Sequence, residues 1–182
     1  MSWEDVLRDI EASAEADERR ELLGEVADRT RRELARLHLV DRLRAATGSV
    51  VTLGVGPAGP ATGRMLRVGP DWLLLDTGPA EVLVVPNAIL WVGGLSPRAV
   101  DPAAVSAVDR RLALGSVLRA VARDRRVVTV TLRDGGNLRG VVRRVGADFF
   151  DVTPARRAGQ HGSIEGDERC LPFAALAVVR LA

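Results

Sequence analysis

Arginine carries the most obvious binding chemistry in this 182-residue chain, and every basic residue other than histidine is an arginine. From residue 101 to 182, fourteen arginines stand against nine acidic residues. Guanidinium groups keep their positive charge and bind phosphates with two parallel hydrogen bonds. The candidates for nucleic-acid contact are Arg119, Arg123, Arg126, Arg139, Arg143, Arg144, Arg156 and Arg157. If several converge, we expect a phosphate-attracting face whose affinity falls with salt; otherwise they form a solvated surface.

A single aspartate lies in a sequence that could do acid–base chemistry. Leu73-Leu74-Leu75-Asp76-Thr77-Gly78 resembles the Asp-Thr-Gly signature of retroviral-type aspartic proteases. That chemistry needs two aspartates sharing one proton, so one copy of the motif would have to dimerise. The matching place in the second half of the chain reads Val152-Thr153-Pro154. We therefore interpret Asp76 as a turn residue and keep a dimeric protease as a remote alternative.

The remaining reactive side chains form no catalytic or metal-binding set. His38 and His161 have no histidine, cysteine or carboxylate at ligand spacing, and Cys170 is the single cysteine. The glycines do not lie between a strand and a helix as in phosphate-binding loops. The sequence therefore predicts a protein that is not an enzyme, with no catalytic residues, no metal and no cofactor.

The elements that must position these residues occur twice. Residues 127–152 repeat residues 50–75 at an offset of 77 without a gap, which indicates an internal duplication. The equivalent pairs that we assign to turns and bends are Gly63 and Gly140, Gly69 and Gly146, and Asp71 and Asp148. Trp72 and Phe149 also occupy one repeat position. We expect them to pack in a core or between units, and the alternative is that they stack on bases.

The duplication extends to both sides. Val85–Val92 resembles Leu171–Val178, and Arg36–Leu39 resembles Arg111–Leu114. Each repeat is therefore a helix followed by several short strands. Apolar residues at helical spacing before residue 46 predict a long N-terminal helix, and a basic insertion at 154–169 predicts a loop in the second repeat.

These patterns predict a mainly β protein with helices (α+β). The expected organisation is an N-terminal helical segment at 1–46, a first small β-barrel at 47–95, a linker and helix at 96–124, and a second barrel at 125–182. Arg119, Arg123, Arg125 and Arg126 lie at the end of that second helix.

The sequences of the predicted strands resemble those of proteins with the Sm-like fold, a small SH3-like barrel. Residues 36–92 and 111–181 each carry a helix, V-x-V-x-L strands, turn glycines, a V-G-x-D turn and a proline before the last strand. The resemblance implies barrels that associate through strand edges. The positions at which Sm proteins hold RNA read Asp148-Phe149-Phe150-Asp151 without asparagine and Arg169-Cys170-Leu171 without glycine. The fold therefore does not carry the RNA pocket with it.

The N-terminal region resembles a family of uncharacterised actinobacterial proteins. The shared wording is Trp3-Glu4-Asp5 and the run from Arg29 to Arg36. That resemblance implies no activity.

Composition limits the partners. No apolar run reaches the roughly 20 residues of a membrane helix, and the lone cysteine fits a reducing compartment, so we expect a cytoplasmic protein without membrane contact or small-molecule substrate. We predict a binding or assembly module. Its partner is a second copy or another protein, reached through the N-terminal helix and barrel edges. Nucleic-acid binding by the arginine-rich second barrel is the alternative.

Overall fold

The computed structural model describes residues 4, 24, 29–32, 34–100, 111–155 and 168–181. The chain divides into two units, Met1–His38 and Leu39–Ala182, and the described strands all belong to the second unit. β-Branched and leucine-rich runs separated by glycine and proline give the strands, as expected for half-buried pleated surfaces.

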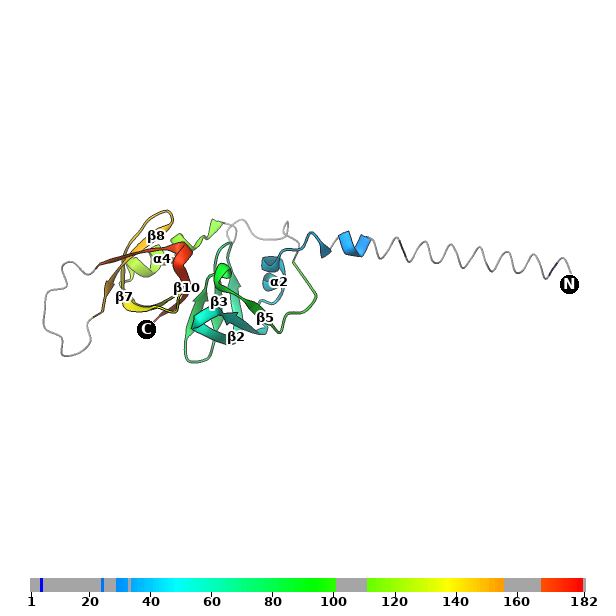
Figure 1. Ribbon diagram of the computed structural model, residues 1–182, viewed down its shortest axis with the longest axis horizontal. Coiled ribbons are helices and arrows are strands. Elements are labelled where there is room, and N and C mark those ends of the chain that lie inside the picture. Colours follow the sequence, from blue (N-terminus) through cyan, green and yellow to red (C-terminus); the bar gives the residue numbers. More distant parts are fainter. Residues whose placement is uncertain are drawn as a thin grey trace. The chain divides into compact units, whose positions relative to one another are not determined.

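Ten strands form one antiparallel sheet in the order β5-β1-β2-β3-β4-β10-β6-β7-β8-β9 (Figure 1). The first half contains β1 (Val50–Val55), β2 (Gly59–Val68), β3 (Leu73–Asp76), β4 (Glu81–Val84) and β5 (Trp91–Gly93). The second half contains β6 (Val127–Leu132), β7 (Asn137–Val145), β8 (Phe149–Pro154), β9 (Arg169–Pro172) and β10 (Leu176–Leu181). Each half repeats one pairing order, in which the fifth strand pairs the first and the others follow in sequence.

The two halves also share the same irregularity in strand pairing. The register of β2 against β3 shifts between Met65 and Arg67, and that of β7 against β8 shifts between Val142 and Arg144. Each shift marks a β-bulge, where two residues of one strand face one residue of its neighbour. The bulges lie at equivalent positions of the two halves.

The halves are joined where β4 pairs with β10, and this pairing is called the junction below. Val84 lies opposite Val178 and Leu83 opposite Val179. The hydrophobic core of the first half includes Ala177 and Val178 of the second half. The core of the second half in turn includes residues of the first half, such as Leu83. The junction therefore buries apolar side chains from both halves as well as pairing two strand edges.

Two short helices cover the sheet. Helix α2 (Leu39–Ala45) contacts β2, and α4 (Leu114–Arg123) packs against β7 with Leu114 and Leu118 buried. No local side chain caps α4, because Ala113 precedes it. Asp71 of the first half supplies the cap: its carboxylate oxygen Oδ1 accepts a hydrogen bond from the Leu114 amide at 2.8 Å.

The predicted fold class is wrong. The structure contains one continuous, open ten-stranded sheet with outer strands β5 and β9, in place of two separate barrels after a long helix. The pairing of β4 with β10 merges the two strand sets, because each supplies an edge that the other completes. The helices with described bounds are 7 and 10 residues long. Most of the predicted N-terminal helix lies outside the described residues, and the described part contains no long helix.

Two of the glycines assigned to bends, and the aspartate interpreted as a turn residue, make identifiable local contacts. A Cβ atom at Gly63 or Gly140 would overlap the carbonyl oxygen of Asp76 or Thr153 on the neighbouring strand. These two glycines thus allow close approach of two backbones. Asp76 ends β3 at the surface, and its Oδ1 accepts a hydrogen bond from the Gly78 amide at 2.9 Å. That is the geometry of an Asx-turn.

Candidate functional site

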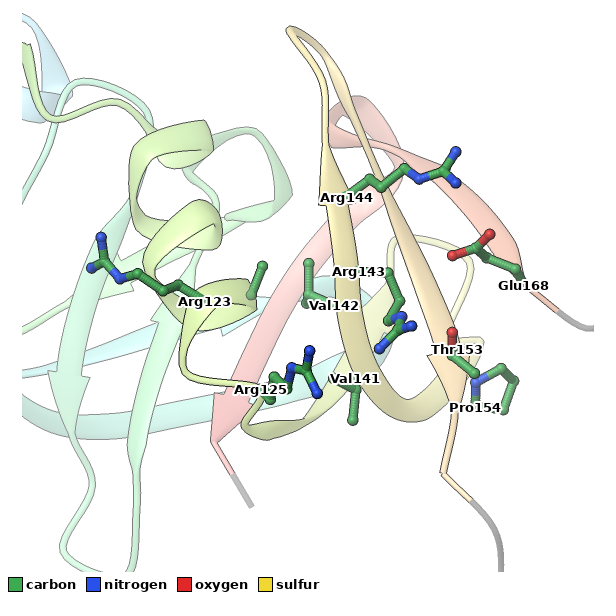
Figure 2. Close-up of a pocket in the computed structure, with 10 residues that line it drawn as sticks. Arg123, Arg125, Val141, Val142, Arg143, Arg144, Thr153, Pro154 and Glu168 are labelled. Atoms are coloured by element: carbon green, nitrogen blue, oxygen red, sulfur yellow. The ribbon is translucent and has the colours of Figure 1, made fainter.

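A wide pocket of about 1030 Å³ lies beside the end of α4 and the bulged part of β7 (Figure 2). Its lining, here called the arginine pocket, consists of Ala122, Arg123, Arg125, Val141, Val142, Arg143, Arg144, Thr153, Pro154 and Glu168. Three of the eight predicted nucleic-acid contacts, Arg123, Arg143 and Arg144, therefore line one pocket. Arg125, which lies outside the predicted set, joins them.

The bulge in β7 explains why two consecutive arginines are exposed. Successive residues of a regular strand point to opposite faces, and Val142 and Val152 pair just before the irregularity. Arg143 is the inserted residue, and Arg144 then lies opposite Asp151. Both arginine side chains are exposed.

The end of α4 supplies the other side of the pocket. Arg125 follows the helix with a φ of 51°, the left-handed conformation that usually belongs to glycine after a helix. In Figure 2 the guanidinium groups of Arg125 and Arg143 turn toward the same space. Arg123 points away from β7, and Arg144 extends on the side of Glu168.

The pocket is strongly positive, because four arginines and one glutamate line it. At its rim, Arg123 Nε lies 3.9 Å from Asp124 Oδ1, and both side chains are largely exposed. A surface ion pair of this length contributes little to stability and leaves the arginine charge available. An anion with several phosphates would find multiple donors here.

The other predicted contacts lie elsewhere or outside the described residues. Arg119 is exposed on α4, Arg126 precedes β6, and Arg139 is exposed on β7, but none of the three lines the pocket. Arg156 and Arg157 lie outside the described residues. Among the residues that the structure describes, no group of three histidine, cysteine or acidic side chains could hold a metal.

The outer strand β5 forms a second candidate surface. A pocket of about 270 Å³, called the edge pocket, is lined by Leu39, Arg42, Ile89, Leu90, Trp91, Val92, Gly94 and Leu95. Leu90 and Trp91 are exposed large apolar side chains. At the opposite end of the sheet, β9 exposes Arg169 and Cys170. Partial desolvation, followed in importance by the Asp151 carboxylate, raises the pKa of the Cys170 thiol.

Sequence reasoning missed how residues of the first half hold the second. Asp71 caps α4, and the Trp72 indole Nε1 donates a hydrogen bond to the Leu112 carbonyl at 2.6 Å. A signal was present in the sequence, because α4 lacks a capping residue of its own at Ala113. The partner lies about forty residues earlier, where local patterns do not point.

No protein-family model and no curated protein matches this chain. In the described part of the chain, none of the helices has the length and apolar content needed to cross a membrane.

Proposed function

We propose that this chain is a non-enzymatic assembly module whose copies join edge to edge, β9 of one copy against β5 of the next. The observation that carries the proposal is the junction. There β4 of the first half pairs with β10 of the second, and β10 is the fifth strand of its repeat, equivalent to β5. The outer strand β9 is the fourth strand of its repeat, equivalent to β4, and the outer strand β5 is equivalent to β10. Each outer strand has no described neighbour on one side.

The register of the junction predicts the register between copies. Val84 lies opposite Val178 in the junction, and their repeat equivalents are Cys170 and Val92. Directly opposed residues on antiparallel strands have Cα atoms about 4.5–5.5 Å apart, which suits a disulfide.

The fit of the lone cysteine to a reducing compartment supports action in the cytoplasm.

The test is a register-specific cross-link. The Val92→Cys variant is oxidised mildly at a concentration at which the parent associates in sedimentation. The introduced thiol at position 92 is expected to form a disulfide with Cys170 of another copy, identified by peptide mass spectrometry. The matched control is Leu66→Cys, which places a second exposed thiol on the β2 bulge away from both edges. A parent that stays monomeric, or equal cross-linking of both variants, contradicts edge pairing.

The arginine pocket favours a second candidate function, binding of a single-stranded nucleic acid. Four exposed arginines around one hollow can contact several phosphates, and binding then releases counterions and weakens steeply with salt. The equivalents of Arg143 and Arg144 in the first half are Leu66 and Arg67, so only the bulge of the second half carries two consecutive arginines.

Fluorescence anisotropy with labelled single-stranded RNA and DNA at several salt concentrations tests this candidate. The double variant Arg143→Gln, Arg144→Gln should weaken binding and flatten the plot of log K against log salt by about 0.7 for each phosphate that is no longer neutralised. Arg133→Gln is the control, since Arg133 is exposed on the same half outside the pocket. Equal slopes for the parent and the double variant contradict a role for this pocket.

A further inference from the structure

The turn before β3 is inserted into the second half of the sheet. Trp72 is 3% exposed and lies in one hydrophobic cluster with Leu114 and Leu176. Its indole donates to the Leu112 carbonyl. The turn therefore acts as an apolar plug at the junction.

The equivalent turn of the second half has the same shape but is not inserted. A Cβ atom at Gly69 would overlap the Trp72 ring, and one at Gly146 would overlap the Phe149 ring. Each aromatic ring thus lies over the glycine three residues before it. Phe149, however, is 38% exposed.

The site that would receive Phe149 exists at the other end of the sheet. Leu114 and Leu176, which share the cluster of Trp72, are 2% and 0% exposed. Their repeat equivalents Leu39 and Leu90 are 48% and 74% exposed and line the edge pocket. Within the chain, Trp72 packs against Leu114 and Leu176. Phe149 and the edge pocket are the repeat equivalents of the two sides of that contact, and both are exposed.

We propose that Phe149 of one copy inserts into the edge pocket of the next copy, beside Leu90 and Trp91. This inference rests on the proposed edge pairing and identifies the side chain that gives it specificity. Pairing of β9 with β5 in the junction register brings the turn before β8 to the edge pocket, as pairing of β4 with β10 brings Trp72 to its cluster. A phenyl ring needs no hydrogen-bond partner there, so the pocket can be wholly apolar at its centre.

The decisive experiment uses two full-length variants, Phe149→Ala and Leu90→Arg. The first lacks the plug and the second blocks the pocket, and both changes are at exposed positions, so circular dichroism should show parent-like folding. Each variant alone should associate at least roughly ten-fold more weakly than the parent, as expected for loss of an interface anchor. An equimolar mixture should form a 1:1 heterodimer, since it restores one intact plug and one intact pocket.

Other outcomes separate this inference from edge pairing. If Phe149→Ala keeps parent-like affinity, and still gives the disulfide to Cys170 when combined with Val92→Cys, the copies pair without the plug and the inference is overturned. If Val92→Cys by itself gives no such disulfide, both proposals fail. If the mixture stays monomeric although both variants fold, the pocket receives something other than Phe149, such as a segment of its own chain, and the inference is again overturned. Phe149→Trp, which copies Trp72, should keep parent-like association.

Discussion

Arg125 joins a backbone requirement to a charge. It is left-handed at the end of α4, and it lines the arginine pocket. Glycine is the usual residue in this conformation because it has no Cβ atom to strain. Replacement of Arg125 by glycine therefore removes the guanidinium group while it relaxes the backbone, and charge can be tested separately from folding.

We expect Arg125→Gly to raise the free energy of unfolding by about 0.5 kcal/mol. Relief of about 1 kcal/mol of left-handed strain is partly offset by the greater freedom of glycine in the unfolded chain. Urea denaturation measures the change. Arg126→Gly is the control: Arg126 has no positive φ, so this variant should be less stable than the parent. Equal destabilisation in both variants would refute the strain at Arg125.

Cys170 provides a pH-dependent readout of the β9 edge. Because its pKa is raised, the thiolate fraction at a given pH below that pKa is smaller than in an unfolded chain, and alkylation is slower. The rate should climb as pH rises through the raised pKa. Asp151→Asn removes a nearby negative charge, lowers the pKa and should speed iodoacetamide labelling at a pH of about 8. A rate that is unchanged in this variant would exclude the Asp151 contribution.

At the scale of elements, the cap of α4 distinguishes two aspartates that the repeat makes equivalent. Asp71 accepts a hydrogen bond from the Leu114 amide, whereas Asp148 is exposed. Asp71→Ala should destabilise the chain by about 1 kcal/mol, the usual value of a lost helix cap. Asp148→Ala, measured at concentrations where the chain is monomeric, should change stability little. Thermal unfolding followed by circular dichroism compares them, and similar destabilisation would deny Asp71 its capping role.

The elements also show where sequence reasoning succeeds. Alternating and β-branched runs place strands at Val50 and Val127. Gly63 and Gly140 are assigned to strand bends by the sequence, and the structure adds that a neighbouring backbone approaches each of them closely. The bulge that exposes both Arg143 and Arg144 has no clear sequence signal, since one inserted residue leaves little trace in a pattern of period two. Composition therefore predicts an arginine-rich surface in the second half, but the sequence does not show which arginines line one pocket.

At the scale of the molecule, the sequence could not reveal that the two strand sets form one sheet. Leu83 and Val179 read as ordinary strand residues, and nothing local says that they face each other. An edge strand paired within the chain has the same periodicity as one that faces solvent. Which edges meet depends on contacts almost a hundred residues apart, as for Val82 and Arg180.

The shared cores predict that both halves unfold together. Leu83 belongs to the first half but packs in the cluster of the second. Leu83→Ala should cost about 2–4 kcal/mol, as for other buried leucines. Hydrogen exchange should show the slowest amides of β1–β3 and of β6–β8 losing protection by the same amount. Leu66→Ala, at an exposed site, is the control, and loss confined to one half would mean that the halves open independently.

The pairing order of the sheet also constrains the number of repeats in any assembly that uses the outer strands. Every chain adds two repeats, so a closed ring of chains contains an even number of repeats and never an odd one. The bulge with Arg143 and Arg144 then alternates with the bulge with Leu66 and Arg67 around that ring. The pair of consecutive arginines would recur with twice the spacing of the underlying fold, which sets the interval at which a long polyanion could meet this double charge.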